Sequence, residues 1–283
     1  MTYRAKAYAK INLFLQVNGK RPDGYHELDT IMQSVGIYDS LELSLTNDDS
    51  IDVFCDNAEL CGVDNIIYRA VEMFFSLLGR RFGVRISLNK KIPVAAGLGG
   101  GSADASATLL MLNKAVDNKF TIEQLMPIAA KLGADVPFCL VGGTQRCRGI
   151  GEILSEVSAP KMYYVLLKEL TKKSTGQMFS VLDAAEYTAK CDIEEFIGLL
   201  NSGNIQNISS GLFNSFEYCW ETNDMFAPFR PFSPCGMFLS GSGPTVCALF
   251  SNESAAKQCA DALISKGYNA YFAESRFKGV EIE

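Results

Sequence analysis

The chain has 283 residues and a formal net charge of −6, with 48% apolar and 20% charged residues. This length allows two domains or one large one, and the composition is ordinary for a globular protein. The acidic balance argues against nucleic-acid binding, because contacts to a phosphate backbone require a basic surface. An anionic ligand would therefore need a local positive site within an acidic protein.

The cysteine and histidine content narrows the class further. The nine cysteines form no C-x-x-C pair, and the first residues, MTYRAKAYAK, resemble no signal peptide. We therefore expect reduced thiols, several of them buried, in a cytoplasmic protein. No apolar run approaches the ~18 residues that a membrane-spanning helix needs, so no membrane contact is expected. The single histidine, His26, excludes a zinc site that requires two histidines.

The first predicted element is a half-buried strand. Apolar and polar residues alternate from Ala5 to Val17, which is the period of a β-strand. Lys10 and Asn12 share the polar face of this strand, about 7 Å apart. Pro-Asp-Gly at 22–24 predicts a turn, and a histidine in that turn is by itself expected to be solvated.

Apolar periodicity then predicts strands and helices along the rest of the chain. The expected strands lie at 41–45, 51–55, 84–88, 142–154 (two strands and a glycine turn), 162–167, 236–240, 246–250 and 269–274. The expected helices begin at Asp64 as N-cap, at Ser102 and at Thr121 with its capping-box partner Gln124, and cover 176–186, 193–201, 211–222 and 253–266. The irregular order predicts an α+β protein of two domains, residues 1–157 and 158–283.

The segment PVAAGLGGGSADAS, residues 93–106, lies between a predicted strand and a predicted helix. A flexible hinge is one interpretation of its glycines. The strand–loop–helix context favours a phosphate loop, since glycine N–H groups and the positive end of the helix dipole converge on one point. The Walker pattern is absent, because Ser102-Ala103 follows the glycines where Lys and Ser or Thr would stand.

Two further segments leave alternatives open. SGSGPT at 240–245 lies between two apolar strands and fits either a simple hairpin turn or a second ligand loop. Asp135 lies in LGADVPF, just before Val136-Pro137. A lone aspartate in that setting is usually a helix N-cap, although it also suits an acid facing a ligand.

Together these segments resemble a known superfamily. PVAAGLGGGSADASATL is similar to the phosphate loop of the GHMP kinases (galactokinase, homoserine kinase, mevalonate kinase and phosphomevalonate kinase), and FLSGSGPTVCALF resembles their C-terminal glycine motif. Within that superfamily, AKINLFLQVNGKRPDGYHELDTI and GADVPF resemble the kinases of 4-diphosphocytidyl-2-C-methyl-D-erythritol, from the non-mevalonate isoprenoid pathway. The resemblance covers about residues 5–275. It implies a two-domain GHMP kinase fold, ATP in the cleft between the domains, and phosphorylation of the substrate's 2-hydroxyl.

The resemblance also implies roles for particular residues. Lys10 and Asp135 correspond to a catalytic pair. Asn12, Tyr25, His26, Thr175 and Phe179 correspond to substrate-binding residues, with Tyr25 stacking on cytosine and His26 hydrogen-bonding its edge. The residues that correspond to an ATP site are Asn65, Pro93, Val94, Ala95, Ala96, Gly97, Leu98, Gly99, Gly100, Gly101 and Ser102. Mg²⁺ would accompany ATP, with its ligands unassigned. The implied partners are small molecules only, and the expected state is a monomer or homodimer.

Two other functions compete with this interpretation. A sister kinase acting on a small alcohol without a base would have no use for Tyr25 and His26 in RPDGYHEL. A nucleotide-binding regulator without chemistry would not need both Lys10 and Asp135. Ser215 in FNSFE, Arg146 and Arg148 depart from the superfamily pattern, and the sequence gives them no function.

Overall fold

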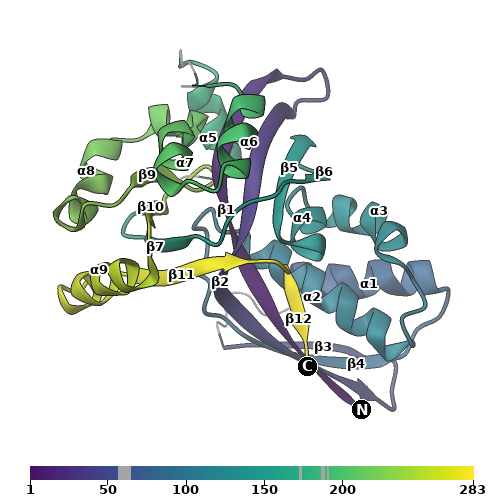
Figure 1. Ribbon diagram of the computed structural model, residues 1–283. Coiled ribbons are helices and arrows are strands. Elements are labelled where there is room, and N and C mark those ends of the chain that lie inside the picture. The colour runs from purple at the N-terminus through teal and green to yellow at the C-terminus, as the bar shows by residue number, and fades with distance from the viewer. Residues whose placement is uncertain (57–64, 172–173, 186–188, 190) are drawn as a thin grey trace.

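The computed structural model describes residues 1–56, 65–171, 174–185, 189 and 191–283 (Figure 1). A long antiparallel hairpin of β1 (Thr2–Lys20) and β2 (His26–Thr46) runs through the molecule. Its turn closes where the N–H of Arg21 donates to the carbonyl of Tyr25 at 2.7 Å. The strand and the turn predicted at this end of the chain are therefore confirmed.

The prediction that the first strand is half-buried is wrong over residues 7–15, where both faces are covered. Helix α2 (Gly100–Ala115) packs against β1, and the loops that carry the glycines contact Lys10 and Asn12. The alternation of polar residues thus indicates a strand whose polar face packs against loops of the protein and does not face water. A buried ammonium or amide needs polar partners, and these side chains have them.

Strands and helices from the first half of the chain surround the hairpin. β4 (Gly83–Asn89) and β5 (Thr144–Gly149) pair with different parts of β2, while β3 (Ile51–Cys55) pairs with β4 and β6 (Ile153–Glu156) pairs with β5. Helices α1 (Ile66–Leu78), α2, α3 (Ile122–Leu132) and α4 (Val136–Val141) pack together on one side of the hairpin (Figure 1). Apolar side chains from both layers form the core between them.

Local capping fixes where two of these helices begin. Thr121 and Gln124 form the predicted capping box of α3. Helix α1 is capped by Asn65, whose Oδ1 accepts the N–H of Ile67 at 2.8 Å. Asp64, the predicted cap, lies outside the described residues. The short helix α4 was indicated only by the N-cap interpretation of Asp135, because six residues give too little periodicity to recognise.

The second half of the chain builds a smaller layer that joins the first. Strands β7 (Tyr163–Leu167), β9 (Gly236–Leu239), β10 (Val246–Phe250) and β11 (Ala270–Arg276) form the order β11-β7-β10-β9, and helix α9 (Glu253–Ser265) packs against them. The end of β11 pairs with β2, and β12 (Val280–Ile282) pairs with β1, which brings the two termini together (Figure 1). A division into domains at residue 157 stays a prediction.

The remaining elements lie between β7 and β9. They are helices α5 (Thr175–Leu182), α6 (Ile193–Asn201), α7 (Ile205–Gly211) and α8 (Thr222–Phe226), strand β8 (Phe213–Asn214), and the 3-10 helices η2 (Ser215–Cys219) and η3 (Ala227–Phe232). The helix predicted over 211–222 is wrong. Residues 213–214 instead pair in parallel with Phe14 and Leu15 of β1, and this tertiary pairing overrides the local apolar pattern.

The cysteines agree with the expected reduced state. Those within the described ranges are free thiols, and Cys139, Cys147, Cys247 and Cys259 are buried. Cys61 lies outside these ranges. None of the helices described here combines the length and apolar character needed to cross a membrane.

Candidate active site

A cavity of about 1020 Å³ collects most of the residues that the sequence singled out. Its lining comes from β1, the 24–28 turn, the 93–102 loop, the residues before α4, helix α5 and the 241–242 loop. All the predicted catalytic, substrate-binding and ATP-binding residues line it: Lys10, Asn12, Tyr25, His26, Asn65, Pro93 to Ser102, Asp135, Thr175 and Phe179. Segments far apart in the chain thus meet around one space.

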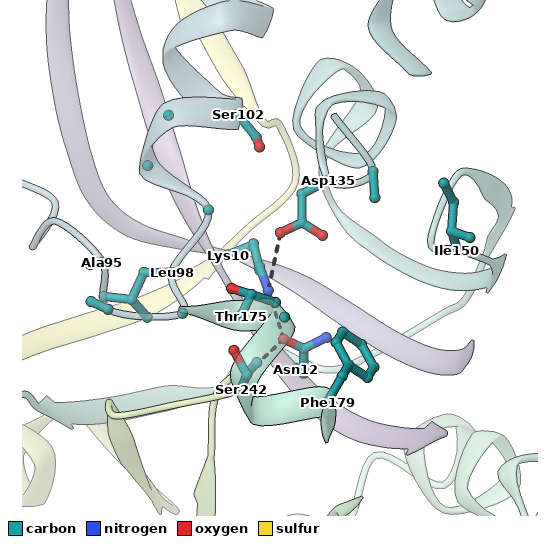
Figure 2. A pocket seen from close by; sticks show the side chains of 18 of the residues that line it. Lys10, Asn12, Ala95, Leu98, Ser102, Asp135, Ile150, Thr175, Phe179 and Ser242 are labelled. Atoms are coloured by element: carbon teal, nitrogen blue, oxygen red, sulfur yellow. Dashed lines mark hydrogen bonds and ion pairs between the residues drawn. The ribbon is translucent and has the colours of Figure 1, made fainter. Parts of the chain in front are cut away.

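Lys10 lies at the centre of this cavity with two partners. Its Nζ is 3.4 Å from Asp135 Oδ2 and donates to Asn12 Oδ1 at 2.8 Å (Figure 2). Lys10 is only 4% exposed, so its charge depends on these oxygens in place of water. Asn12 is held in turn, because its Nδ2 donates to Thr30 Oγ1 at 2.9 Å. The predicted shared face of Lys10 and Asn12 is confirmed.

Asp135 occupies the N-cap position of α4 but makes no side-chain cap hydrogen bond. Its carboxylate instead points toward Lys10 and the cavity (Figure 2). A helix cap acts through its side-chain oxygen, so capping does not account for this side chain. Of the two interpretations left open, the one in which the acid faces a ligand agrees with the geometry.

The first glycine loop turns sharply before α2. Gly97 and Gly99 have φ of +80° and +69°, a conformation that favours glycine. A Cβ on Gly97 would lie 2.4 Å from the carbonyl oxygen of Ser240, and one on Gly99 would lie 2.8 Å from Lys10 Cγ. Gly99 is also the N-cap of α2 and brings no side chain to its first-turn N–H groups. This is the backbone arrangement of an anion site.

The second glycine loop packs directly on the first. It connects the antiparallel strands β9 and β10, so it is a hairpin turn as well as part of the cavity wall. Ser240 Oγ donates to the carbonyl of Gly97 at 3.0 Å, and the N–H of Gly241 donates to Asn12 Oδ1 at 3.0 Å. The two interpretations of SGSGPT are therefore compatible.

The opposite end of the cavity is aromatic. The ring of His26 stacks on Phe179, with centroids 4.3 Å apart and planes at 15°. His26 Nε2 lies 2.7 Å from Asp183 Oδ1. His26 is only 8% exposed, so the expectation of a solvated histidine is wrong, whereas Tyr25 beside it is 59% exposed. Thr175 and Phe179 lie one turn apart on α5 and face this end.

A buried charge cluster lies under the glycine loop and was not predicted from the sequence. Lys90 Nζ bonds to Asp39 and, at 2.7 Å, to Asp104 Oδ2, while Asp39 Oδ1 accepts the N–H of Lys91 at 2.5 Å and of Ile92 at 2.8 Å. Burial raises the pKa of Asp104 to about 8, against the lowering effect of Lys90. The signal available was the pair of lysines immediately before the loop. This cluster fixes the start of the segment that leads into Pro93.

Two of the three residues that departed from the superfamily pattern, Arg146 and Ser215, have structural partners. Arg146 forms two bonds to Asp29, at 2.9 and 2.8 Å, and one to Glu194 at 2.6 Å. Ser215 Oγ accepts the N–H of Val17 at 3.1 Å and lies 3.3 Å from the carbonyl of Leu15. Nothing in the structure explains Arg148.

The comparisons with known proteins place this fold among the GHMP kinases. Residues 65–143 match the family "GHMP kinases N terminal domain", and residues 232–270 match "GHMP kinases C terminal". A crystal structure of homoserine kinase from Cytophaga hutchinsonii superposes with a TM-score of 0.79 at 18% identity, over 100% of this chain and 97% of that one, and so shares the fold. The mixed α and β GHMP kinase fold is confirmed.

More similar relatives define the family within that class. The 4-diphosphocytidyl-2-C-methyl-D-erythritol kinase of Desulfitobacterium hafniense is 38% identical, covering 96% of each chain, and that of Caldicellulosiruptor bescii is 39% identical, covering 92% and 93%. A crystal structure of 4-(cytidine 5'-diphospho)-2C-methyl-D-erythritol kinase superposes with a TM-score of 0.82 at 28% identity, over 96% of this chain and 98% of that one. The chain belongs to the 4-diphosphocytidyl-2-C-methyl-D-erythritol kinase family.

Proposed function

We propose that the protein transfers the γ-phosphoryl group of ATP to the 2-hydroxyl of 4-diphosphocytidyl-2-C-methyl-D-erythritol. The observation that carries this proposal is one cavity with the Lys10–Asp135 pair between a glycine-lined end and an aromatic end. A kinase of this substrate needs a phosphate site, a base site and a charged pair between them. Family membership points to the same reaction.

At the glycine-lined end, we assign the β- and γ-phosphates to the backbone N–H groups at the start of α2. Gly99, Gly100, Gly101 and Ser102 line the cavity there, and the positive end of the helix dipole favours negative charge. Asn65, at the start of α1, lies on the same wall and is assigned to the adenosine. Pro93 to Leu98 form the rest of that wall.

Asp135 and Lys10 are assigned to the reacting atoms. The 2-hydroxyl oxygen attacks the γ-phosphorus, its proton passes to the Asp135 carboxylate, and the bond from phosphorus to the leaving ADP oxygen breaks. Lys10, 3.4 Å from that carboxylate, orients it and places a positive charge where negative charge moves during transfer. Phosphoryl transfer depends mainly on such positioning and charge stabilisation.

The cavity also suits Mg²⁺ brought by ATP. Mg²⁺ takes oxygen ligands and usually binds one or two protein groups together with substrate phosphates. Among the residues described, no cluster of three or more His, Cys, Asp or Glu could bind a metal alone. Ser102 and Asp135 point into the same space and would supply oxygens (Figure 2). When bound, the ion would neutralise phosphate charge.

The aromatic end is assigned to cytosine. Tyr25 offers an exposed ring for stacking, and His26 and Phe179 form a stacked pair next to it. Stacking on aromatic rings contributes about 1–3 kcal/mol per base. Thr175 extends this wall and Asn12 lies toward the centre, where the sugar alcohol would reach Lys10.

A phosphate-transfer assay tests this proposal against its alternatives. With ATP and Mg²⁺, we expect turnover of 4-diphosphocytidyl-2-C-methyl-D-erythritol and negligible turnover of homoserine or mevalonate. Preference for one of those small alcohols would indicate a sister kinase. ATP binding without transfer to any of the three would indicate a regulator.

We further propose that the protein acts in the cytoplasm as a monomer or homodimer with small-molecule partners only. The acidic composition and the free thiols support this proposal. Sedimentation with and without both substrates measures the oligomeric state, and a larger assembly would contradict it.

A further inference from the structure

Asn214 is a fully buried asparagine, 0% exposed, in the short strand β8. Its Nδ2 donates to the carbonyls of Leu239 and Gly241, at 2.8 and 2.9 Å, and its Oδ1 accepts the N–H of Phe216 at 3.0 Å. An amide side chain has two donors, and here one is used on the last residue of β9 and the other on the second glycine loop. No other side chain of that size supplies two donors and an acceptor in one plane.

Gly241, one of the residues that Asn214 binds, is linked to Lys10 through Asn12. Gly241 offers its carbonyl to Asn214 and its N–H to Asn12 Oδ1, at 3.0 Å. The same Asn12 oxygen accepts Lys10 Nζ at 2.8 Å, and Lys10 in turn contacts Asp135. A continuous set of contacts therefore leads from Asn214 to the Lys10–Asp135 pair.

Asn214 is itself anchored to the strand that carries Lys10. Strand β8 pairs in parallel with β1 at Phe14 and Leu15, and the next residue, Ser215, bonds to the backbone of β1 at Val17. The second glycine loop is thereby tied to β1 at two places, through Asn12 directly and through Asn214 indirectly. Two attachments fix the loop's position better than one.

We propose that Asn214 is a positioning residue for phosphoryl transfer, which holds Gly241 so that Asn12 keeps Lys10 against Asp135. This proposal rests on the proposed function, in which Lys10 and Asp135 act on the transferred group. Displacement of a reacting group by about 1 Å can cost 10²-fold in rate, so a loop that moves affects turnover. Asn214 lines no part of the cavity itself, and it acts through these contacts.

The test compares Asn214→Ser and Asn214→Asp in two backgrounds. In the wild-type background we expect kcat to fall roughly 10-fold or more, with the KM for each substrate changed less than about 3-fold. In a Lys10→Met background the same substitutions should lower the residual kcat by less than about 2-fold, because residues that act as a unit are not additive. Equal fold losses in both backgrounds, or unchanged kcat in folded protein, would overturn the proposal.

Asn113→Ser is the matched control. Asn113 is also a buried asparagine whose side chain is hydrogen-bonded at both ends. Its Nδ2 donates to the carbonyl of Phe120 at 2.8 Å, and its Oδ1 accepts the N–H of Phe120 at 3.0 Å. It lies near the far end of α2 from the glycine loop. We expect this variant to lose stability but to keep wild-type kcat. A loss of kcat equal to that of Asn214→Ser would mean that any buried asparagine gives the effect.

A second readout needs no substrate. In free Asn214→Ser protein, the Gly241 amide should exchange with solvent at least about 10-fold faster than in the wild type, because its bond to Asn12 weakens. Unchanged exchange of the Gly241 amide would overturn the proposal about Asn214, whatever the substrate of the protein. Failure of the wild type to phosphorylate the cytidyl substrate would count against the proposed function alone.

If the Asn214 variants do not fold, Gly241→Ala tests the same contacts. Its Cβ would lie 3.4 Å from Lys10 Nζ and 3.1 Å from the carbonyl oxygen of Gly97. Its loss of kcat should likewise nearly vanish in the Lys10→Met background, and multiplicative losses would overturn the proposal.

Discussion

The two ends of the cavity differ in the kind of groups that line them. The phosphate end consists of backbone turns and buried charges, with Lys10 4% exposed and Gly97 and Gly99 in the left-handed region. The base end consists of side chains on a turn and a helix, and its Tyr25 is 59% exposed. Contacts between distant parts of the chain fix both ends: hydrogen bonds between the two glycine loops and β1 at the first end, and the His26–Phe179 stack with the bond from His26 to Asp183 at the second.

This difference indicates how each end can change. At the phosphate end, an added methyl group would meet backbone or Lys10, so substitution disturbs the reacting groups themselves. At the base end, an exposed ring can be removed without disturbing its neighbours. We therefore expect substitutions at the phosphate end to change turnover, and substitutions at the base end to change the affinity for one substrate.

The largest effect is expected for Asp135→Asn. This change keeps the shape of the side chain, removes its charge and still permits a helix cap. We expect kcat to fall by roughly 10²-fold or more, the scale of general-base loss, with little further loss when Lys10→Met is added. Steady-state kinetics on folded protein measures this. Turnover near that of the wild type would leave Asp135 a structural residue.

Gly99→Ala sharpens the comparison at the glycine loop. The new Cβ would lie 2.8 Å from Lys10 Cγ, in a conformation that disfavours alanine. Because Lys10 would have to move away from this Cβ, we expect kcat/KM for ATP to fall roughly 30-fold, the equivalent of about 2 kcal/mol. Gly198→Ala, with open space around its Cβ and no part in the cavity, is the control. Equal kcat/KM values for ATP in the two variants would contradict the close contact between Gly99 and Lys10.

Tyr25→Ala tests the base end. We expect the dissociation constant of the cytidyl substrate to rise about 10-fold, near the lower part of the stacking range because the ring is exposed. Affinity for ATP should stay the same. Calorimetric titration with each ligand measures both, and Tyr218→Ala, at another exposed tyrosine outside the cavity, is the control. Equal weakening of both ligands would show that this turn supports the fold.

The smallest effect on turnover and on ligand affinity is expected for Asp104→Asn, under the phosphate end, where the change is in stability. The pKa of Asp104 is raised from 3.8 to about 8 by burial, beside Lys90 and Asp39. The folded state therefore keeps a proton that the unfolded chain releases, so this group's contribution to stability falls as pH rises from about 4 to about 8. Asparagine does not titrate, so the variant should gain free energy of unfolding relative to the wild type between pH 6 and 9. Urea unfolding of both proteins at pH 6 and at pH 9 measures this gain. The same change in free energy of unfolding with pH in the variant and the wild type would contradict it.

Local sequence signals predicted much of the fold. Alternation identified β1, the capping box identified α3, and the glycines between a strand and a helix identified the first loop. These signals are local, because each depends on residues within one or two turns of chain. The helix predicted over 211–222 failed where the decisive partner, β1, lies about two hundred residues away.

The same limit applies to the site. The sequence and its family resemblance indicated Lys10 with its partner Asp135, and His26, but not what holds His26 or the second glycine loop in place. The bond from His26 to Asp183 and the bond from Asn214 to Gly241 join residues that no periodicity connects. The burial of His26 was missed for the same reason, since Phe179 covers it from another element. Tertiary contacts of this kind become visible only in the structure.

A substrate without its base shows whether the two ends of the cavity bind two different parts of the reacting pair. 2-C-methyl-D-erythritol 4-phosphate carries the same alcohol but lacks the cytidylyl group that the base end would bind. We predict that kcat/KM for this acceptor is lower than for the cytidyl substrate by about 10²-fold or more, the equivalent of about 2.7 kcal/mol or more. In Tyr25→Ala protein the ratio of the two kcat/KM values should be closer to one. Equal kcat/KM for the two acceptors would show that the aromatic end plays no part in substrate recognition.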